Sequence, residues 1–177
     1  MLKHTPPHAP GAASAWVERF AHLIGPGTVL DLAAGNGRHA RLLSGRGHHV
    51  VAVDRDVSSL RALGDPHVKV LETDLEAESA WPLGTQRFAG VVVTNYLHRP
   101  LLPAIVAAVG PGGILIYETF AVGNERFGKP SNPAFLLQPG ELIDAVRGRL
   151  RVVAYEDLEV AAPRPAMIQR IVARAED

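Results

Sequence analysis

Four polar residues recur along the chain at intervals that match one strand plus one helix. They stand at or just after the ends of short apolar runs, separated by 20, 21 and 23 residues: Asp54, Asp74, Asn95 and Glu118. If those runs are parallel strands, the four side chains meet at the carboxyl edge of one sheet, where open α/β sheets bind ligands. An acid after the second strand can accept hydrogen bonds from both hydroxyls of a ribose, and Asp74 with Leu75 can meet the amino group and the face of an adenine.

The turn ahead of these residues is rich in glycine. Residues 28–37 read Thr-Val-Leu-Asp-Leu-Ala-Ala-Gly-Asn-Gly, a run that carries an acid at Asp31 and breaks at Gly35-Asn36-Gly37. A buried strand that ends in glycines and opens a helix leaves room for a ligand against bare backbone. The free N–H groups at the start of that helix can bind a carboxylate. The pattern therefore predicts a ligand with an adenosine end and an amino-acid end.

Strand-like and helix-like segments alternate along most of the chain. A first helix is expected after Ser14, with Trp16 in its apolar face. Apolar runs predict strands, and helical spacing of apolar residues predicts the helices between them. The strands are expected at 28–33, 49–54, 68–73, 88–94 and 114–119, and the helices at 38–44, 57–63, 101–109 and 140–147. Near-continuous apolar runs of this kind suit a parallel sheet covered on both faces.

The carboxyl-terminal part differs from the rest. Residues 151–160 and 167–173 both read as strands, and the six residues between them are too few for a crossover helix. The two strands are therefore expected to pair as an antiparallel hairpin. Five parallel strands plus this hairpin predict an α/β, doubly wound, Rossmann-like fold with a seven-strand mixed sheet and helices on both faces.

Length and composition fit one globular domain. The chain has 177 residues, of which 47% are hydrophobic, and we expect a disordered arm over 1–11 and a single domain over 12–177. Lysine plus arginine equals aspartate plus glutamate at 18 each, so the charge balance predicts no nucleic-acid partner. No apolar run is long enough to span a bilayer, and the first residues lack a signal-peptide core. We therefore expect a cytoplasmic protein without a membrane partner.

No metal site is expected. The sequence holds no cysteine, so a cysteine–metal cluster is excluded. His48 and His49 are adjacent, and adjacent residues of a strand face opposite sides of the sheet, which favours a solvated pair over a pair of ligands.

The motifs, in this order and spacing, resemble those of the class I S-adenosylmethionine-dependent methyltransferases. The resemblance covers about residues 28–175 and rests on Asp-Leu-Ala-Ala-Gly-Asn-Gly, Val-Ala-Val-Asp-Arg-Asp, Glu-Thr-Asp-Leu-Glu and Val-Val-Val-Thr-Asn-Tyr-Leu-His-Arg-Pro. Within that family the chain is most similar to the small single-domain enzymes of the tellurite-resistance type. The resemblance implies S-adenosylmethionine (AdoMet) as cofactor, S-adenosylhomocysteine as product, and methyl transfer by in-line displacement to a small-molecule acceptor.

The resemblance also implies roles for the matching residues. The methionine end would be shaped by Asp31, Gly35 and Gly37, while Asp54 would bind the ribose. The expected cofactor residues are, in full, Asp31, Ala33, Gly35, Asn36, Gly37, Asp54, Arg55, Asp74, Leu75 and Asn95. Two positions depart from the family pattern. Ala33 replaces the first glycine of the loop, and the sequence after Asn95 is not the Pro-Pro-Tyr of amide and base N-methyltransferases, so transfer to such groups is not supported.

Residues for the acceptor and for catalysis are expected in two loops. The loop after the fourth strand faces the transferred methyl group in this family, so His98 and Tyr96 are the candidate proton acceptors. The connection 121–139 is long and rich in Gly, Pro and polar residues, and its sequence fits a loop over the site and an ordinary surface loop equally. The expected acceptor contacts are Arg99, Tyr117, Asn124 and Arg126.

Two alternative functions stay open. Residues 35–40 also match the Gly-x-Gly-x-x-Ala pattern of NAD(P)-binding Rossmann oxidoreductases, with Asp54 near the distance expected of a ribose-binding acid. The acid at Asp31 and the terminal hairpin favour the methyltransferase. A non-catalytic AdoMet-binding module would carry the same loop and the same acids. The sequence predicts no oligomeric state.

Overall fold

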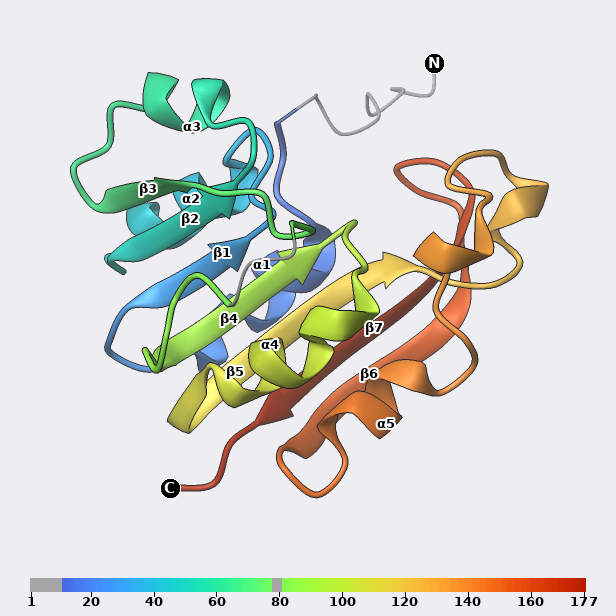
Figure 1. Cartoon of the computed structure of the whole chain (residues 1–177). Helices are drawn as coiled ribbons and strands as arrows, with labels where there is room; N and C mark the ends of the chain where they lie inside the picture. The colour runs from blue at the N-terminus through green and yellow to red at the C-terminus, as the bar shows by residue number, and fades with distance from the viewer. Residues whose placement is uncertain (1–10, 78–80) are drawn as a thin grey trace, which may run out of the picture.

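The computed structural model describes residues 11–77 and 81–177, so the expected disordered arm lies outside the described residues except for Gly11. The chain forms a seven-stranded sheet with helices on both faces (Figure 1), which confirms the predicted fold class. The strands lie in the order β3-β2-β1-β4-β5-β7-β6. Their bounds are β1 Val29–Leu32, β2 Val50–Asp54, β3 Val68–Glu72, β4 Phe88–Thr94, β5 Val109–Phe120, β6 Arg151–Val160 and β7 Ala166–Arg174.

Strands β1 to β5 are parallel, and β7 pairs antiparallel with both β5 and β6. The predicted hairpin of the last two strands is therefore confirmed. The strand order reverses at β1, because β2 and β3 lie on one side of it and β4 and β5 on the other. Ligands of open α/β sheets bind at the carboxyl ends of the strands where the order reverses in this way.

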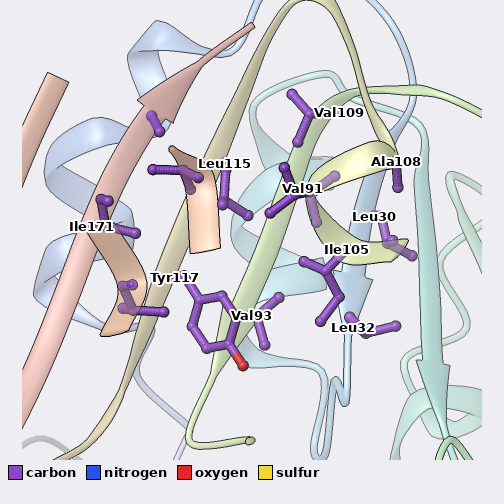
Figure 2. Packing of buried hydrophobic residues seen from close by; sticks show 14 of the residues in the cluster. Leu30, Leu32, Val91, Val93, Ile105, Ala108, Val109, Leu115, Tyr117 and Ile171 are labelled. Atoms are coloured by element: carbon purple, nitrogen blue, oxygen red, sulfur yellow. The ribbon is translucent and has the colours of Figure 1, made fainter. Parts of the chain in front are cut away.

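Two groups of helices cover the two faces of the sheet, and alternate strand residues point to each. Val29 and Val92 pack in one core with α1 (Ala15–Phe20), α2 (Arg38–Gly45) and α3 (Ser58–Ala62). The other core joins residues such as Leu30 and Val91 to α4 (Leu102–Ala107) and α5 (Glu141–Val146). Figure 2 shows part of this second core, in which Ile105 of α4 packs with strand residues such as Tyr117 of β5. Short 3₁₀ turns lie at η1 Ala21–Leu23, η2 Arg99–Leu101, η3 Asn124–Arg126 and η4 Pro133–Phe135.

The structure differs from the predicted elements at the start of β5. This strand begins at Val109, which pairs with Phe88, so the predicted helix over 101–109 ends earlier, at Ala107. The added strand residues include Gly113, where a Cβ atom would lie 2.8 Å from the carbonyl oxygen of Phe88. Only glycine allows two backbones to approach this closely. Helical spacing of apolar residues carries no signal for such a contact.

The remaining expectations concern membranes and metals. In residues 11–77 and 81–177 no helix has the length and apolar character needed to cross a membrane. A cytoplasmic location stays a prediction. That same part of the chain holds no group of three potential metal ligands. His49 packs against His67, with the two ring centroids 5.1 Å apart.

Candidate functional site

The loop between β1 and α2 contains three residues in the left-handed backbone region. They are Ala33 at φ 54°, Gly35 at φ 56° and Gly37 at φ 77°. A Cβ atom at Gly37 would lie 2.8 Å from the side chains of Leu60 and Leu63, so the helix α3 packs directly on this glycine. The tight turn predicted from the glycines therefore forms, and it exposes its backbone at the carboxyl edge of the sheet.

Asp54 connects the end of β2 to this loop. Its Oδ2 accepts a hydrogen bond of 2.8 Å from the Gly35 N–H, and its Oδ1 accepts one of 3.0 Å from the Asp56 N–H. A carboxylate offers about four acceptor positions, so Asp54 keeps acceptor capacity for a ligand after making both bonds.

A first cavity of about 280 Å³ opens beside Asp54. It combines carboxylates from the ends of two strands with apolar side chains. Its lining residues are Ala33, Asp54, Arg55, Thr73, Asp74, Leu75, Glu76, Tyr96 and Phe135. Acids that can accept from hydroxyl and amino groups, placed next to flat apolar surfaces, suit a nucleoside.

A second cavity of about 240 Å³ lies on the other side of the loop after β4. Asn95 lines this cavity while its neighbour Tyr96 lines the first, so the two spaces share one wall. Apolar side chains from β5 and the hairpin face charged groups here. The lining residues are Ala12, Ala13, Ser14, Ala15, Arg38, Asn95, Glu118, Phe120, Val160, Ala162, Pro163, Arg164, Ala166, Ile168 and Arg170.

The backbone is strained at the two loops between which the cavities open. Ala33 after β1 and Asn95 after β4 both have φ 54°, and in residues 11–77 and 81–177 no other non-glycine residue has a positive φ. Residues held in this region cluster at ligand sites, where the surrounding structure keeps them in place.

Asp31 is a buried acid within β1, 1% exposed. Burial raises the pKa of its carboxyl from 3.8 to about 7, against the opposing effects of a backbone hydrogen bond from Ala40 and the charge of Arg38. Its Oδ2 has no hydrogen-bond partner among the described residues. A buried acceptor without a partner is rare in folded proteins and marks a place where a ligand or a solvent molecule can bind.

Ser14 fixes the segment that lines the second cavity from the N-terminal side. Its N–H donates to His39 Nε2 at 3.0 Å, and its hydroxyl donates to Glu118 Oε1 at 2.6 Å. The second oxygen of Glu118 accepts from Arg170 at 3.0 Å, and Arg170 also pairs with Glu156. This chain of contacts joins α1, β5, β7 and β6 around one side of the cavity.

The structure brings most of the expected cofactor residues to one edge of the sheet. Five of them line the first cavity: Ala33, Asp54, Arg55, Asp74 and Leu75. Asn95 lines the second cavity, and the glycines form the loop between β1 and α2. Asn36 lies just before the Gly37 cap of α2, and its Oδ1 accepts from the Arg38 N–H at 3.2 Å.

The expected acceptor contacts lie elsewhere, since none of them lines either cavity. Arg99 is paired with Glu141, with its Nε 2.7 Å from Oε1. Asn124 holds its own loop, as its Nδ2 donates to the Pro130 carbonyl oxygen. The other two expected contacts are Tyr117, buried in the core with its hydroxyl on the Tyr96 carbonyl oxygen, and Arg126, which lies 3.7 Å from Glu159.

The two candidate proton acceptors have different positions. His98 precedes the turn η2 and lines neither cavity. Tyr96 lines the first cavity, where burial and the nearby acids Glu76 and Asp74 raise the pKa of its phenol above its usual range. A phenol with a raised pKa stays protonated near neutral pH, so Tyr96 lines the first cavity as a neutral side chain.

Sequence reasoning missed several lining residues. The first cavity gains Thr73, Glu76 and Phe135, and the second gains Phe120, Arg164 and Arg170. Glu118 also lines the second cavity, and the spacing of the strand-end residues already located it at this edge of the sheet. Nothing in the sequence indicated Phe135, Arg164 or Arg170, because only the path of the loop 121–139 and of the hairpin brings them to the cavities.

Comparisons with known proteins agree with this geometry. Residues 11–80, which are 70 of the 177 residues, match the family model described as tellurite resistance protein TehB. No curated protein matches the sequence significantly. Among solved structures, TehB from Haemophilus influenzae superposes with a TM-score of 0.72 at 19% identity, over 93% of this chain. The chain spans 63% of the length of that structure.

Two further structures were solved with the product of AdoMet. The 1,6-didemethyltoxoflavin-N1-methyltransferase of Burkholderia thailandensis, with bound 1,6-didemethyltoxoflavin and S-adenosylhomocysteine, gives a TM-score of 0.69 at 22% identity, covering 96% of this chain and 80% of that one. A glycopeptide N-methyltransferase complexed with S-adenosylhomocysteine gives 0.62 at 20% identity, covering 95% and 91%. The chain therefore has the fold of the class I methyltransferases, as its resemblance implied.

Proposed function

We propose that this protein binds AdoMet along the carboxyl edge of its sheet and transfers the methyl group to a small-molecule acceptor. The observation that carries the proposal is the first cavity. There, Asp54 from the end of β2 and Asp74 with Leu75 from the end of β3 line one space beside the glycine-rich loop. We assign the ribose hydroxyls to the carboxylate of Asp54 and the adenine amino group to that of Asp74.

The methionine end of the cofactor fits the loop and the start of α2. The N–H groups at the start of this helix suit the carboxylate of the ligand. Asp31 suits the ammonium group, because its buried Oδ2 has no partner among the described residues and a cation would compensate its burial. Asn95, on the wall shared by the two cavities, then lies near the sulfonium.

When bound, AdoMet supplies an electrophilic methyl carbon on a sulfonium whose leaving group is a neutral thioether. The protein's task is to hold the acceptor in line with the methyl group and to exclude water. We assign the acceptor to the second cavity, where Phe120 and Ile168 form apolar walls and Arg164 adds a cation. No proton acceptor is assigned, because the raised pKa of Tyr96 keeps its phenol protonated and His98 lies outside both cavities.

Calorimetric titration of the purified protein with AdoMet and with S-adenosylhomocysteine tests the proposal. We expect both to bind, and Asp54→Ala to weaken binding by more than about 100-fold, since two hydrogen bonds to a charged group are lost. Asp56→Ala is the matched control, because Asp56 follows Asp54 by two residues but its carboxylate accepts from the Ser58 N–H and hydroxyl and lines neither cavity. Equal affinities of Asp54→Ala and the wild type would refute the ribose assignment.

Two further measurements separate the alternatives. NAD in the same titration distinguishes an oxidoreductase, for which NAD would bind and AdoMet would not. Transfer of a labelled methyl group to a panel of thiols, oxyanions and small metabolites distinguishes an enzyme from a non-catalytic binding module. We expect AdoMet binding without NAD binding, and label transfer to at least one small molecule.

A further inference from the structure

Phe135 is an exposed aromatic residue at the edge of the first cavity. The residue is 46% exposed, yet it lines the same space as Leu75 and Tyr96. The next two residues, Leu136 and Leu137, are buried. The loop 121–139 is therefore anchored in the core beside Phe135, and the aromatic ring of Phe135 lines the cavity.

The segment around Phe135 is fixed by its own backbone contacts. Phe135 ends the turn η4, whose first residue is Pro133 and whose cap is Asn132, with the Oδ1 of Asn132 accepting from the Ala134 N–H at 3.0 Å. Beyond it, the Leu137 N–H donates to the Phe120 carbonyl oxygen at 3.0 Å. This part of the loop lies at the carboxyl end of β5 (Figure 1).

Arg99 holds the carbonyl groups on both sides of Phe135. Its Nη1 donates to the Ala134 carbonyl oxygen at 2.9 Å, and its Nη2 donates to the Leu136 carbonyl oxygen at 2.8 Å. Glu141 orients the guanidinium through two further contacts, at 2.7 Å from Nε and 2.9 Å from Nη2. Only the fixed fork of an arginine can make these four contacts at once.

We propose that Phe135 covers the adenine ring of the bound cofactor opposite the ends of β2 and β3, and that Arg99 is the positioning residue that holds Phe135 there. The proposal rests on the AdoMet-binding function proposed above. Adenine offers a flat apolar face, and an aromatic side chain stacks on such a face irrespective of the other contacts of the base. Arg99, which follows β4, thereby acts on the cofactor through the loop 121–139 and does not touch the cofactor itself.

Affinities for S-adenosylhomocysteine and for 5′-methylthioadenosine, which lacks the amino-acid end, test the role of Phe135. We expect Phe135→Ala to weaken both ligands by the same factor of about ten, because both carry the adenosine half. Phe127→Ala is the matched control, since Phe127 is a 37% exposed aromatic residue of the same loop that lines neither cavity. Its affinities should equal those of the wild type.

A double-mutant cycle tests the role of Arg99. Arg99→Ala should weaken S-adenosylhomocysteine by a factor similar to that of Phe135→Ala, and Arg99→Lys by a smaller factor. Adding Arg99→Ala to Phe135→Ala should cause no further loss, because the residue that Arg99 positions is already absent. A merely structural arginine would instead give additive losses.

Each outcome decides between the proposals. If the wild-type protein binds neither ligand, the proposed function fails and this inference fails with it. If the wild-type protein binds both and Phe135→Ala binds them as tightly, the proposed function stands and the role of Phe135 is refuted. Additive effects of the two substitutions would refute the positioning role of Arg99 alone.

Discussion

Asp31 and His39 are buried titratable residues next to the same loop, and burial shifts their pKa values in opposite directions. Burial raises the pKa of Asp31 from 3.8 to about 7, and burial with the charge of Arg38 lowers the pKa of His39 from 6.5 to about 3. In the pH range of about 4 to 6.5 the folded protein keeps a proton on Asp31, and the unfolded chain carries one on His39. The two contributions to the pH dependence of stability therefore oppose each other.

Asp31→Asn should reveal the contribution of the histidine. In this variant the unfolded chain still binds a proton on His39, and the folded state no longer binds one at position 31. As pH falls from about 6.5 to 5, the free energy of unfolding should therefore fall relative to the wild type, by about 1.4 kcal/mol per pH unit. Urea titrations at several pH values measure this slope. A slope equal to that of the wild type would show that Asp31 is not protonated in the folded state.

His39→Gln is the matched counterpart, since glutamine keeps an acceptor for the Ser14 N–H. In this variant the folded state binds a proton on Asp31, and the unfolded chain no longer binds one at position 39. The free energy of unfolding should therefore rise relative to the wild type as pH falls over the same range, with a slope of similar size. Slopes of equal sign in the two variants would show that burial does not shift the pKa values of Asp31 and His39 in opposite directions.

Ala33 has a backbone conformation that glycine adopts at lower cost. A left-handed conformation costs a residue with a Cβ atom about 1 kcal/mol, offset in part by the greater freedom of glycine in the unfolded chain. Ala33→Gly should therefore leave the free energy of unfolding unchanged or raise it by up to about 1 kcal/mol, as measured by urea titration. The neighbouring Ala34 is buried and has no positive φ, so Ala34→Gly should lower stability by about 1 kcal/mol. Equal losses in both variants would contradict the strain argument.

At the scale of elements, α1 is tied to the sheet through its cap. The Ser14 hydroxyl accepts from the Trp16 N–H at 3.1 Å and donates to Glu118 on β5. Trp16 in turn lies under the Arg170 guanidinium, 4.5 Å from the ring centroid. The helix thus covers one face of the sheet while its cap lines the second cavity.

Ser14→Ala should remove the cap and the bond to Glu118 together. We expect the free energy of unfolding to fall by about 1–2 kcal/mol, measured by urea titration. Ser58→Ala is the control at the start of α3, where the hydroxyl meets only the exposed Asp56 and the loss should stay within about 0.5 kcal/mol. If the two variants lose equally, the cap and the link to Glu118 together contribute no more to stability than an exposed hydroxyl bond.

At the scale of the molecule, the two cavities collect residues from most of the fold. Their lining comes from the ends of β2 and β3, the loops after β1, β4 and β5, the segment before α1 and the final hairpin. A ligand that contacts all of these elements binds the folded state and not the unfolded chain. Its binding free energy therefore adds to the stability of the whole domain.

AdoMet should raise the melting temperature of the protein. At a concentration of 100 times Kd the added stability is about 2.7 kcal/mol, which for a chain of this length corresponds to about 5–10 °C. Thermal denaturation with and without AdoMet measures the shift, and NAD at the same concentration should give none. A shift with NAD and not with AdoMet would favour the oxidoreductase alternative.

The sequence by itself determined most of the elements and the sheet edge that carries the candidate site. Apolar runs, the glycine turn and the spacing from Asp54 to Glu118 predict parallel strands with polar ends, because side-chain alternation and backbone sterics act over a few residues. The short link before residue 167 likewise predicts the hairpin, since no crossover fits into it.

Only the tertiary structure decided which polar side chains remain available to a ligand. The sequence predicts Arg99 as an acceptor contact, but in the structure Glu141, 42 positions later, pairs with it. Asn124 likewise accepts a hydrogen bond from the Met167 N–H, 43 positions away. The Ser14 hydroxyl donates to Glu118, which lies 104 positions away in the sequence. These pairings depend on the strand order β3-β2-β1-β4-β5-β7-β6 and on the path of the loop 121–139. Local periodicity cannot encode them, because each contact joins segments that become neighbours only when the sheet and its loops are complete.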